Sequence, residues 1–334
     1  MYSYQRFLFF ALNMHASDLI ELEKKERTGH LDLGRCDLKE VPDISKLDWL
    51  ESLVLSNTWL DRKHGQWMYG NNNGTPNKIS FCRPRFLPSS LKSLIIAGDW
   101  TGEWNQKSWE FLKNLTNLNL LDLSHNSIKS CSFLPPSKSL NCLILGGNKI
   151  SDIRPILKYR RLKSLFLNGN SIRNIEPLSD MQSLIVLDLI NNKIKNIEPL
   201  SGLYRLKKLY LSSNKIKSIK PICSLEGLQI LNLSHNKIKE LTPLIMGKRL
   251  IELDLGANFI KNIDPLKLLI KLKHLTLYNN LIEDITPISG LKNLTYLSLY
   301  ENRIEDISKL KKLKKLKKLD VNSNPATASL ITPY

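Results

Sequence analysis

One asparagine returns at a fixed interval of 22 residues through the last two thirds of the chain. The stretches LDLINNKIKNIEPL, LYLSSNKIKSIKPI and LNLSHNKIKELTPL begin at Leu187, Leu209 and Leu231, and each carries the asparagine at the same place. The full set is Asn126, Asn148, Asn170, Asn192, Asn214, Asn236, Asn258, Asn280, Asn302 and Asn324. A fixed period of this length indicates a repeat architecture, in which each repeat buries its apolar face only against its neighbours.

A continuous helix is excluded, although a period of twice eleven would suit a right-handed coiled coil. A proline also recurs every 22 residues, and proline interrupts an α-helix. These prolines are Pro155, Pro177, Pro199, Pro221, Pro243, Pro265 and Pro287. The Leu-x-Leu step has the period of two that is typical of a short strand.

The residue types around one asparagine predict an α/β solenoid. Leu231 and Leu233 point to one side of a strand, and neighbouring coils add parallel strands to one sheet. Ile238 and Leu241 fill the core from the opposite wall. Asn236 suits the turn between them, because its amide can both donate to and accept from backbone groups. Stacked once per coil, the asparagines are expected to form a buried ladder.

The motif LxxLxxLxLxxNxIxxIxPL over residues 115–324 resembles the 22-residue, proline-containing class of leucine-rich repeats. Internalins and a regulatory subunit of protein phosphatase 1 use this class. The resemblance implies a curved, right-handed superhelix, with a parallel β-sheet on the concave face and short 3-10 or irregular segments on the convex face. It also implies that a protein partner binds the concave face.

We expect one continuous solenoid domain with an irregular beginning. Residues 1–30 would form an N-terminal extension and helical cap, residues 31–114 degenerate repeats, 115–324 ten regular repeats, and 325–334 a tail. In the degenerate part, Cys36, Thr58 and Asp99 take the asparagine position. The last two are 41 residues apart, which predicts an insertion of about nineteen residues near 61–85. Trp67 in this insertion is a candidate loop contact; the other five tryptophans, all between Trp49 and Trp109, are expected mainly to pack the first coils.

The stretch LIELEKKERTGHLDLGRC also resembles the start of leucine-rich arrays in bacterial multidomain proteins, including some with a Ras-of-complex GTPase module. No GxxxxGK[ST] motif is present, so no nucleotide site is carried over. The five scattered cysteines indicate neither a disulfide framework nor a zinc site, and they favour a reducing compartment. Residues 1–16 resemble a short signal peptide, or alternatively lead into a helix over Ser17–Arg27. We therefore predict a cytoplasmic, monomeric protein without a membrane span.

A formal net charge of +18 raises the question of an anionic partner. Cations follow the asparagines in successive coils and define a basic ridge of Arg173, Lys193, Lys195, Lys215, Lys217, Lys237, Lys239 and Lys261. The row then turns acidic at Glu283 and Asp284. The ridge has no interleaved aromatic residues for base stacking, so it favours an acidic protein over nucleic acid, or simply a solvated surface.

Variable residues on the outward side of the strands are the candidate partner-binding surface. The aromatic and histidine residues among them are typical of binding hot spots, although strand aromatics can also merely pair with cross-strand neighbours. The candidates are Phe166, Tyr210, His274, Tyr278, Tyr296 and Tyr300.

No pattern in the sequence predicts catalysis, a metal site or a cofactor. The histidines are scattered, and His125 and His235 take ordinary turn positions before an asparagine. Motifs such as G-x-S-x-G and H-E-x-x-H are absent. The leading hypothesis is a non-catalytic protein-binding scaffold. The alternatives are a polyanion or nucleic-acid binder that uses the basic ridge, and the sensor arm of a larger signalling assembly.

Overall fold

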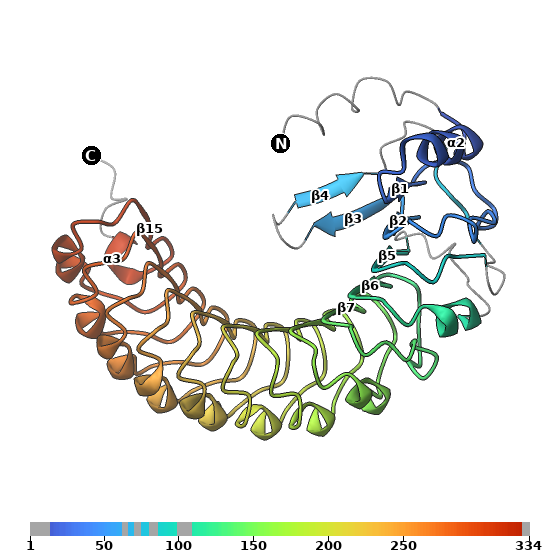
Figure 1. Ribbon diagram of the computed structural model, residues 1–334. Helices are drawn as coiled ribbons and strands as arrows, with labels where there is room; N and C mark the ends of the chain where they lie inside the picture. The colour runs from blue at the N-terminus through green and yellow to red at the C-terminus, as the bar shows by residue number, and fades with distance from the viewer. Residues whose placement is uncertain (1–13, 62–65, 70–74, 80–85, 99–108, 329–334) are drawn as a thin grey trace. The chain divides into compact units, whose positions relative to one another are not determined.

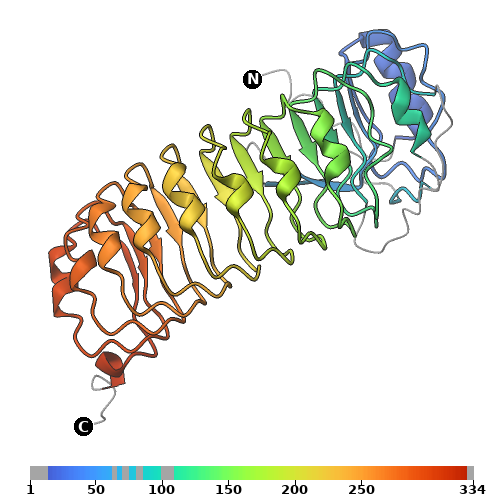
Figure 2. The same ribbon diagram turned by 90° about the horizontal axis from the view of Figure 1, so that it is seen from below.

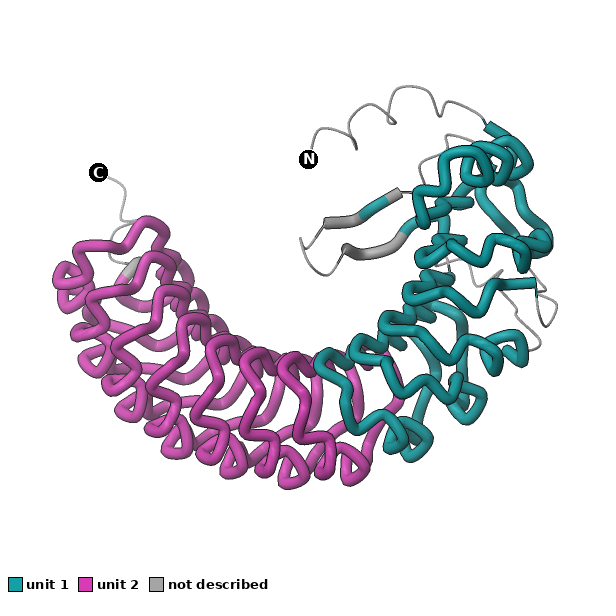
Figure 3. Tube along the Cα trace, viewed as in Figure 1, with its two compact units in different colours: residues 1–166 teal, residues 167–334 magenta. Residues whose placement is uncertain are grey.

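The computed structural model describes residues 14–61, 66–69, 75–79, 86–98 and 109–328. The chain divides into two compact units, residues 1–166 and residues 167–334, which Figure 3 shows in different colours. Each unit is built from coils that consist of a short strand, a turn and a return segment, many of them with a 3-10 helix. The sequence period therefore corresponds to one coil.

The first unit combines a helix, a parallel sheet and a hairpin (Figure 1). Its neighbouring strands follow the order of the sequence. The elements are α2 (Ala16–Glu26), β1 (His30–Asp32), β2 (Ser52–Val54), β5 (Ser93–Ile95), η1 (Glu110–Asn114), β6 (Leu120–Asp122), β7 (Cys142–Ile144), η2 (Arg154–Lys158) and β8 (Ser164–Phe166). A separate antiparallel hairpin consists of β3 (Thr58–Asp61) and β4 (Gln66–Tyr69).

Helix α2 is joined to the first coil through a buried carboxylate. Glu23 is only 4% exposed, and its side chain accepts hydrogen bonds from Gly29 N (2.9 Å) and Trp49 Nε1 (3.0 Å). The guanidinium of Arg27 lies 4.4 Å from the centre of the Trp49 ring. This tryptophan therefore packs the helix against the start of the array.

The second unit is regular. Its strands are β9 (Val186–Asp188), β10 (Lys208–Tyr210), β11 (Ile230–Asn232), β12 (Glu252–Asp254), β13 (His274–Thr276), β14 (Tyr296–Ser298) and β15 (Lys318–Asp320), all parallel and paired in register at 22-residue offsets. Its helices are η3 (Glu176–Leu178), η4 (Glu198–Leu200), η5 (Lys220–Ser224), η6 (Thr242–Met246), η7 (Asp264–Leu268), η8 (Thr286–Ile288), η9 (Ser308–Lys312) and α3 (Pro325–Ala328). Within this unit the strands lie on the concave side, and the 3-10 helices lie in front of them in Figure 2.

The repeated apolar residues form one core along each unit. In the coil of β11, Leu233 and Ile238 are 0% exposed, and Leu231 and Leu241 are 1% exposed. The repeated proline occupies the second residue of η3 to η8, where its fixed φ and missing N–H suit a helix start. The predicted α/β solenoid is confirmed.

Buried asparagines connect each coil of the second unit to the preceding one. Asn236 Nδ2 donates to Leu211 O of the preceding coil at 2.9 Å and to Leu233 O of its own coil at 3.0 Å. Its Oδ1 accepts from Ile216 N, again in the preceding coil, at 3.0 Å. Asn214, Asn258, Asn280 and Asn302 make the equivalent bonds. Each amide thus satisfies backbone groups that the turn would otherwise leave unpaired in the core.

The first unit departs from the predicted numbering at its insertion. Asn77, rather than Thr58, donates to Leu55 O and Leu33 O and accepts from Cys36 N and Leu38 N. The chain therefore leaves the coil at Thr58 into the hairpin β3–β4 and resumes its asparagine position nineteen residues later, since 77 − 58 = 19. The inserted residues thus fall before the asparagine position of this coil rather than after it.

Candidate functional site on the sheet face

The outward residues of the strands in the second unit make the candidate surface. In β9 to β14 the middle leucine is buried, whereas Leu319 of β15 is 42% exposed; in β9 to β14 the residues on either side of the leucine point away from the core. Because the strands pair in register, equivalent residues of successive coils form rows across the sheet, about 4.8 Å apart. Contacts along these rows decide which side chains act together.

Tyr278 lies across a glycine and reaches back over two coils. Its hydroxyl is 2.9 Å from Nε2 of His235, and the two rings meet edge to face with centroids 5.9 Å apart. A Cβ added at Gly256, in the coil between them, would lie 2.1 Å from Cε1 of Tyr278. The absence of a side chain at residue 256 is therefore what allows the tyrosine ring to lie in this position.

Asp254 and Ser234 form a polar network next to the Tyr278 ring. Asp254 Oδ1 accepts from Gly256 N at 3.0 Å, and Ser234, which is 3% exposed, contacts both Asp254 and Tyr278. Burial raises the pKa of the Asp254 carboxyl, and hydrogen bonds from Gly256 and Ser234 oppose that rise. Burial also raises the pKa of Tyr278, with a further contribution from the charge of Asp254. The tyrosine hydroxyl accordingly stays protonated and available as a donor.

A second row lies beside this group on β12 to β15. Glu252 pairs with His274, His274 with Tyr296, and Tyr296 with Lys318. The His274 and Tyr296 rings meet edge to face at 6.1 Å, and Lys318 Nζ lies 5.4 Å from the centre of the Tyr296 ring. His274 Nδ1 is 4.0 Å from Glu252 Oε1, and Tyr300 on the neighbouring row is 39% exposed. We call His274, Tyr278, Tyr296 and Tyr300 the tyrosine cluster.

The remaining candidates from the sequence lie apart from the tyrosine cluster. Tyr210 is half-buried on β10, three strands before β13, the strand that Tyr278 follows. Phe166 lies in the first unit, pairs with Ile144 of the adjacent strand and is only 7% exposed. Its ring therefore packs within the sheet and offers little surface to a partner, contrary to the prediction. Trp67 belongs to β4 by its backbone, and its side chain lies outside the described part of the structure.

Sequence reasoning missed His235 and Gly256 as parts of this surface. His235 was expected to be an ordinary turn residue, yet it bonds to Tyr278. The available signal was the glycine: position 256 is occupied by serine in the two preceding coils, Ser212 and Ser234, and by tyrosine in the next.

The basic ridge is exposed along its whole length. All eight cations have exposed side chains, and none forms an ion pair with another residue in the described part of the chain. Phe259, at the lysine position of its coil, is 49% exposed. The ridge was predicted to have no interleaved aromatic residue, and the exposed Phe259 corrects this prediction.

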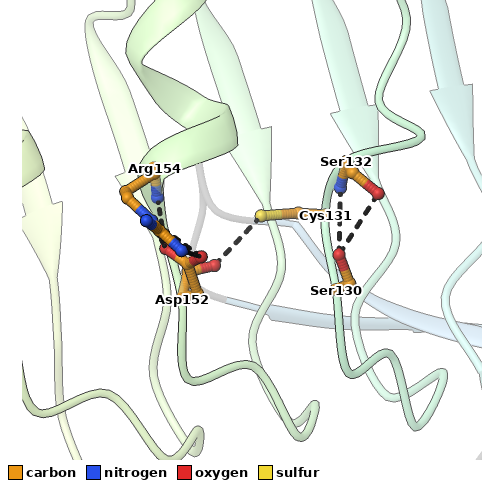
Figure 4. Close-up of polar contacts among 5 residues, drawn as sticks. All are labelled: Ser130, Cys131, Ser132, Asp152 and Arg154. Atoms are coloured by element: carbon orange, nitrogen blue, oxygen red, sulfur yellow. Dashed lines mark hydrogen bonds and ion pairs between the residues drawn. The ribbon is translucent and has the colours of Figure 1, made fainter.

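A polar cluster surrounds Cys131 in the first unit (Figure 4). Cys131 Sγ donates to Asp152 O at 3.5 Å, while Asp152 and Arg154 form an ion pair at 2.7 Å. Burial raises the pKa of the Cys131 thiol to about 11, so the thiolate that a nucleophile requires is scarce at neutral pH. The cluster joins two coils and has no sign of an activated thiol.

Two further properties concern the described residues. They contain no group of three or more histidine, cysteine, aspartate or glutamate side chains placed to hold a metal ion. Within the same ranges, no helix has the length and apolar character that crossing a membrane requires.

Comparison with known proteins assigns the family. The family model of leucine-rich repeats in two copies matches residues 160–202, 182–222, 204–245, 248–290 and 292–331. The chain is a leucine-rich repeat protein. Among solved structures it is similar to an internalin from Listeria monocytogenes, with 30% identity and a TM-score of 0.73, over 89% of this chain and 88% of that one. The predicted resemblance to internalins is confirmed.

A leucine-rich repeat protein from Leptospira interrogans shares the fold at 24% identity and a TM-score of 0.61, over 96% of both chains. A search among curated proteins returned no match. Leucine-rich repeat proteins commonly act as scaffolds for protein interaction, and the internalin-like members are generally non-catalytic.

Proposed function

We propose that this leucine-rich repeat protein binds a protein partner on the concave face of its second unit, through the tyrosine cluster. The observation that carries the proposal is the position of Tyr278, held over Gly256 by its bond to His235 at 2.9 Å. A rigid aromatic side chain loses little conformational entropy on binding, and tyrosines are enriched among binding hot spots. The polar hydroxyls and half-exposed rings of the cluster suit a protein surface rather than a small molecule.

The test is a comparison of partner capture by wild type and by Tyr278→Ala/Tyr300→Ala. Nuclease-treated lysate at about 300 mM salt limits capture through the lysines, because this ionic strength screens exposed charges. Loss of one hot-spot tyrosine weakens binding by about 2 kcal/mol, so the double variant should lose the partner. The control is Tyr204→Ala, which removes a tyrosine that is 66% exposed and lies outside the strands.

Capture by wild type and by Tyr204→Ala, with loss in the double variant, supports recognition by the tyrosine cluster. Equal capture by all three proteins contradicts it. If the only captured species is nucleic acid, at low salt and without nuclease, the alternative function of the basic ridge is supported instead.

We also propose that the protein acts as a monomer in the cytoplasm. Among the described cysteines, Cys131 and Cys223 are free thiols, which suits a reducing compartment. Cell fractionation combined with thiol trapping tests this proposal, and recovery of oxidised protein from an extracellular fraction would contradict it.

A further inference from the structure

A row of residues beside the sheet is fixed by one repeated backbone bond. In six successive coils of the second unit, the residue after the ladder asparagine donates its N–H to an isoleucine carbonyl of the preceding coil, at 2.8 or 2.9 Å. These residues are Lys193, Lys215, Lys237, Phe259, Leu281 and Arg303. We call this row the edge strip. Because the same bond recurs, Phe259 and Leu281 stand directly in line with the three lysines.

Phe259 has no structural role in the core that would explain it. The next residue, Ile260, fills the core position of this coil and is 0% exposed, while Phe259 points outward and is 49% exposed. Leu281 beside it is half-buried. The three preceding coils have lysine at this position and form the same backbone bond, so the fold does not require an aromatic residue here. Phe259 and Leu281 therefore form an apolar site in line with exposed lysines, which an apolar side chain of another molecule can cover.

The charge changes sign beside this apolar pair. Two residues further along each coil, a parallel row carries Lys195, Lys217, Lys239 and Lys261, followed by Glu283 and Glu305. All six side chains are exposed. The change from lysine to glutamate falls between the coils of Phe259 and Leu281. The edge strip is therefore basic, then apolar, and ends at the exposed Arg303, while the parallel row changes from lysine to glutamate. Glu283 and Glu305 outnumber Arg303 beyond the apolar pair, so the two rows together run from basic through apolar to net acidic along about five strand spacings, or roughly 24 Å.

We propose that the edge strip and the parallel row from Lys195 to Glu305 together form a second docking surface, which binds an extended segment of a partner protein with acidic, apolar and basic residues in that order. Carboxylates of the segment lie against Lys193, Lys215 and Lys237. An apolar side chain covers Phe259 and Leu281, and a cation then meets the glutamates. Charge complementarity along the strip fixes the position of the segment. A nucleic acid is uniformly anionic and is repelled by the glutamates.

The experiment measures binding of labelled synthetic peptides to the full chain by fluorescence anisotropy, at about 150 mM salt, where charges separated by more than roughly 8 Å are screened. The first peptide has a run of glutamates, then two leucines, then two lysines. The second has the same composition with the leucines moved ahead of the glutamates. The first should bind more tightly, since only its order matches the strip.

Phe259→Lys is the decisive variant, because it places the side chain of the neighbouring coils at this position and keeps the fold. Covering half of a phenylalanine ring corresponds to about a tenfold change in affinity, so the variant should lose about tenfold for the first peptide and little for the second. Lys237→Glu should weaken both peptides. The matched control Lys267→Glu makes the same charge change at an exposed residue of η7 and should leave both unchanged.

Two results would overturn the proposal. One is equal affinity of wild type and Phe259→Lys for the first peptide. The other is tighter binding of a single-stranded oligonucleotide than of either peptide, with Phe259→Lys unchanged, which would assign the lysines to nucleic acid.

Discussion

Removing one ladder asparagine should cost a large part of the stability of the second unit. In Asn236→Ala, the Ile216 N–H, buried in a residue that is 0% exposed, loses its acceptor at 3.0 Å. An unpaired buried donor costs about 1–3 kcal/mol. The carbonyls of Leu211 and Leu233 lose donors at 2.9 and 3.0 Å, and each lost bond adds about 1 kcal/mol. The expected loss is therefore about 3–5 kcal/mol, against a usual total of about 5–15 kcal/mol for a domain.

Urea denaturation followed by circular dichroism measures this loss, and hydrogen exchange locates it. The Ile216 amide should exchange faster in the variant, because its bond crosses from one coil to the next. Asn262→Ala is the control: Asn262 Oδ1 accepts from Asp264 N at 2.7 Å, but at an exposed turn. Its cost should be at most about 1 kcal/mol. Equal destabilisation by the two substitutions would refute the argument that burial makes the ladder amides important.

Three further predictions concern the sheet face and the thiols. Gly256→Val should displace the Tyr278 ring, because the new Cβ would lie 2.1 Å from it, and partner capture should fall as in the tyrosine variant while circular dichroism stays native. Burial raises the pKa of Asp254, so the folded state keeps a proton that the unfolded chain has released; the free energy of unfolding should fall as pH rises through that window. Asp254→Asn should flatten this dependence in urea titrations at a series of pH values. A thiol reagent at neutral pH should label exposed Cys223 and spare buried Cys131 in peptide mapping, and equal labelling would contradict the assigned burial.

The period of the sequence predicts the core and the fold because every coil of a solenoid has the same backbone conformation and the same packing. Each leucine position has the same surroundings in every coil. Counting residues from the repeated asparagine is therefore sufficient to assign Leu231 and Leu233 to the core. The count no longer identifies the asparagine position where an insertion interrupts the period. An insertion between Thr58 and Asn77 leaves two residues that compete for one position, and only the bonds of Asn77 decide between them.

The candidate surface was harder to predict because it depends on side chains that cross between coils. His235 and Tyr278 are 43 residues apart, which is not a multiple of the period, and the contact exists because Gly256 leaves room for the ring. Phe166 occupies an outward position of β8 by its place in the repeat, and only the structure shows that it is 7% exposed. Phe259 is visible in the sequence as an exception in a row of lysines, but its exposure needs the coordinates.

The turn residue before each ladder asparagine has a further consequence. His235 has a φ of 53°, and the equivalent residues of the other coils in the second unit also have left-handed backbone, with values from 48° to 65°. An L-residue in this conformation gives up roughly 1 kcal/mol, and Gly169 shows that the coil accepts glycine here. The chain nevertheless keeps side chains at most of these turns. At each of these turn positions the side chain can be exchanged at a small and constant cost in stability. The exchange alters the surface of the array and leaves the buried leucines unchanged.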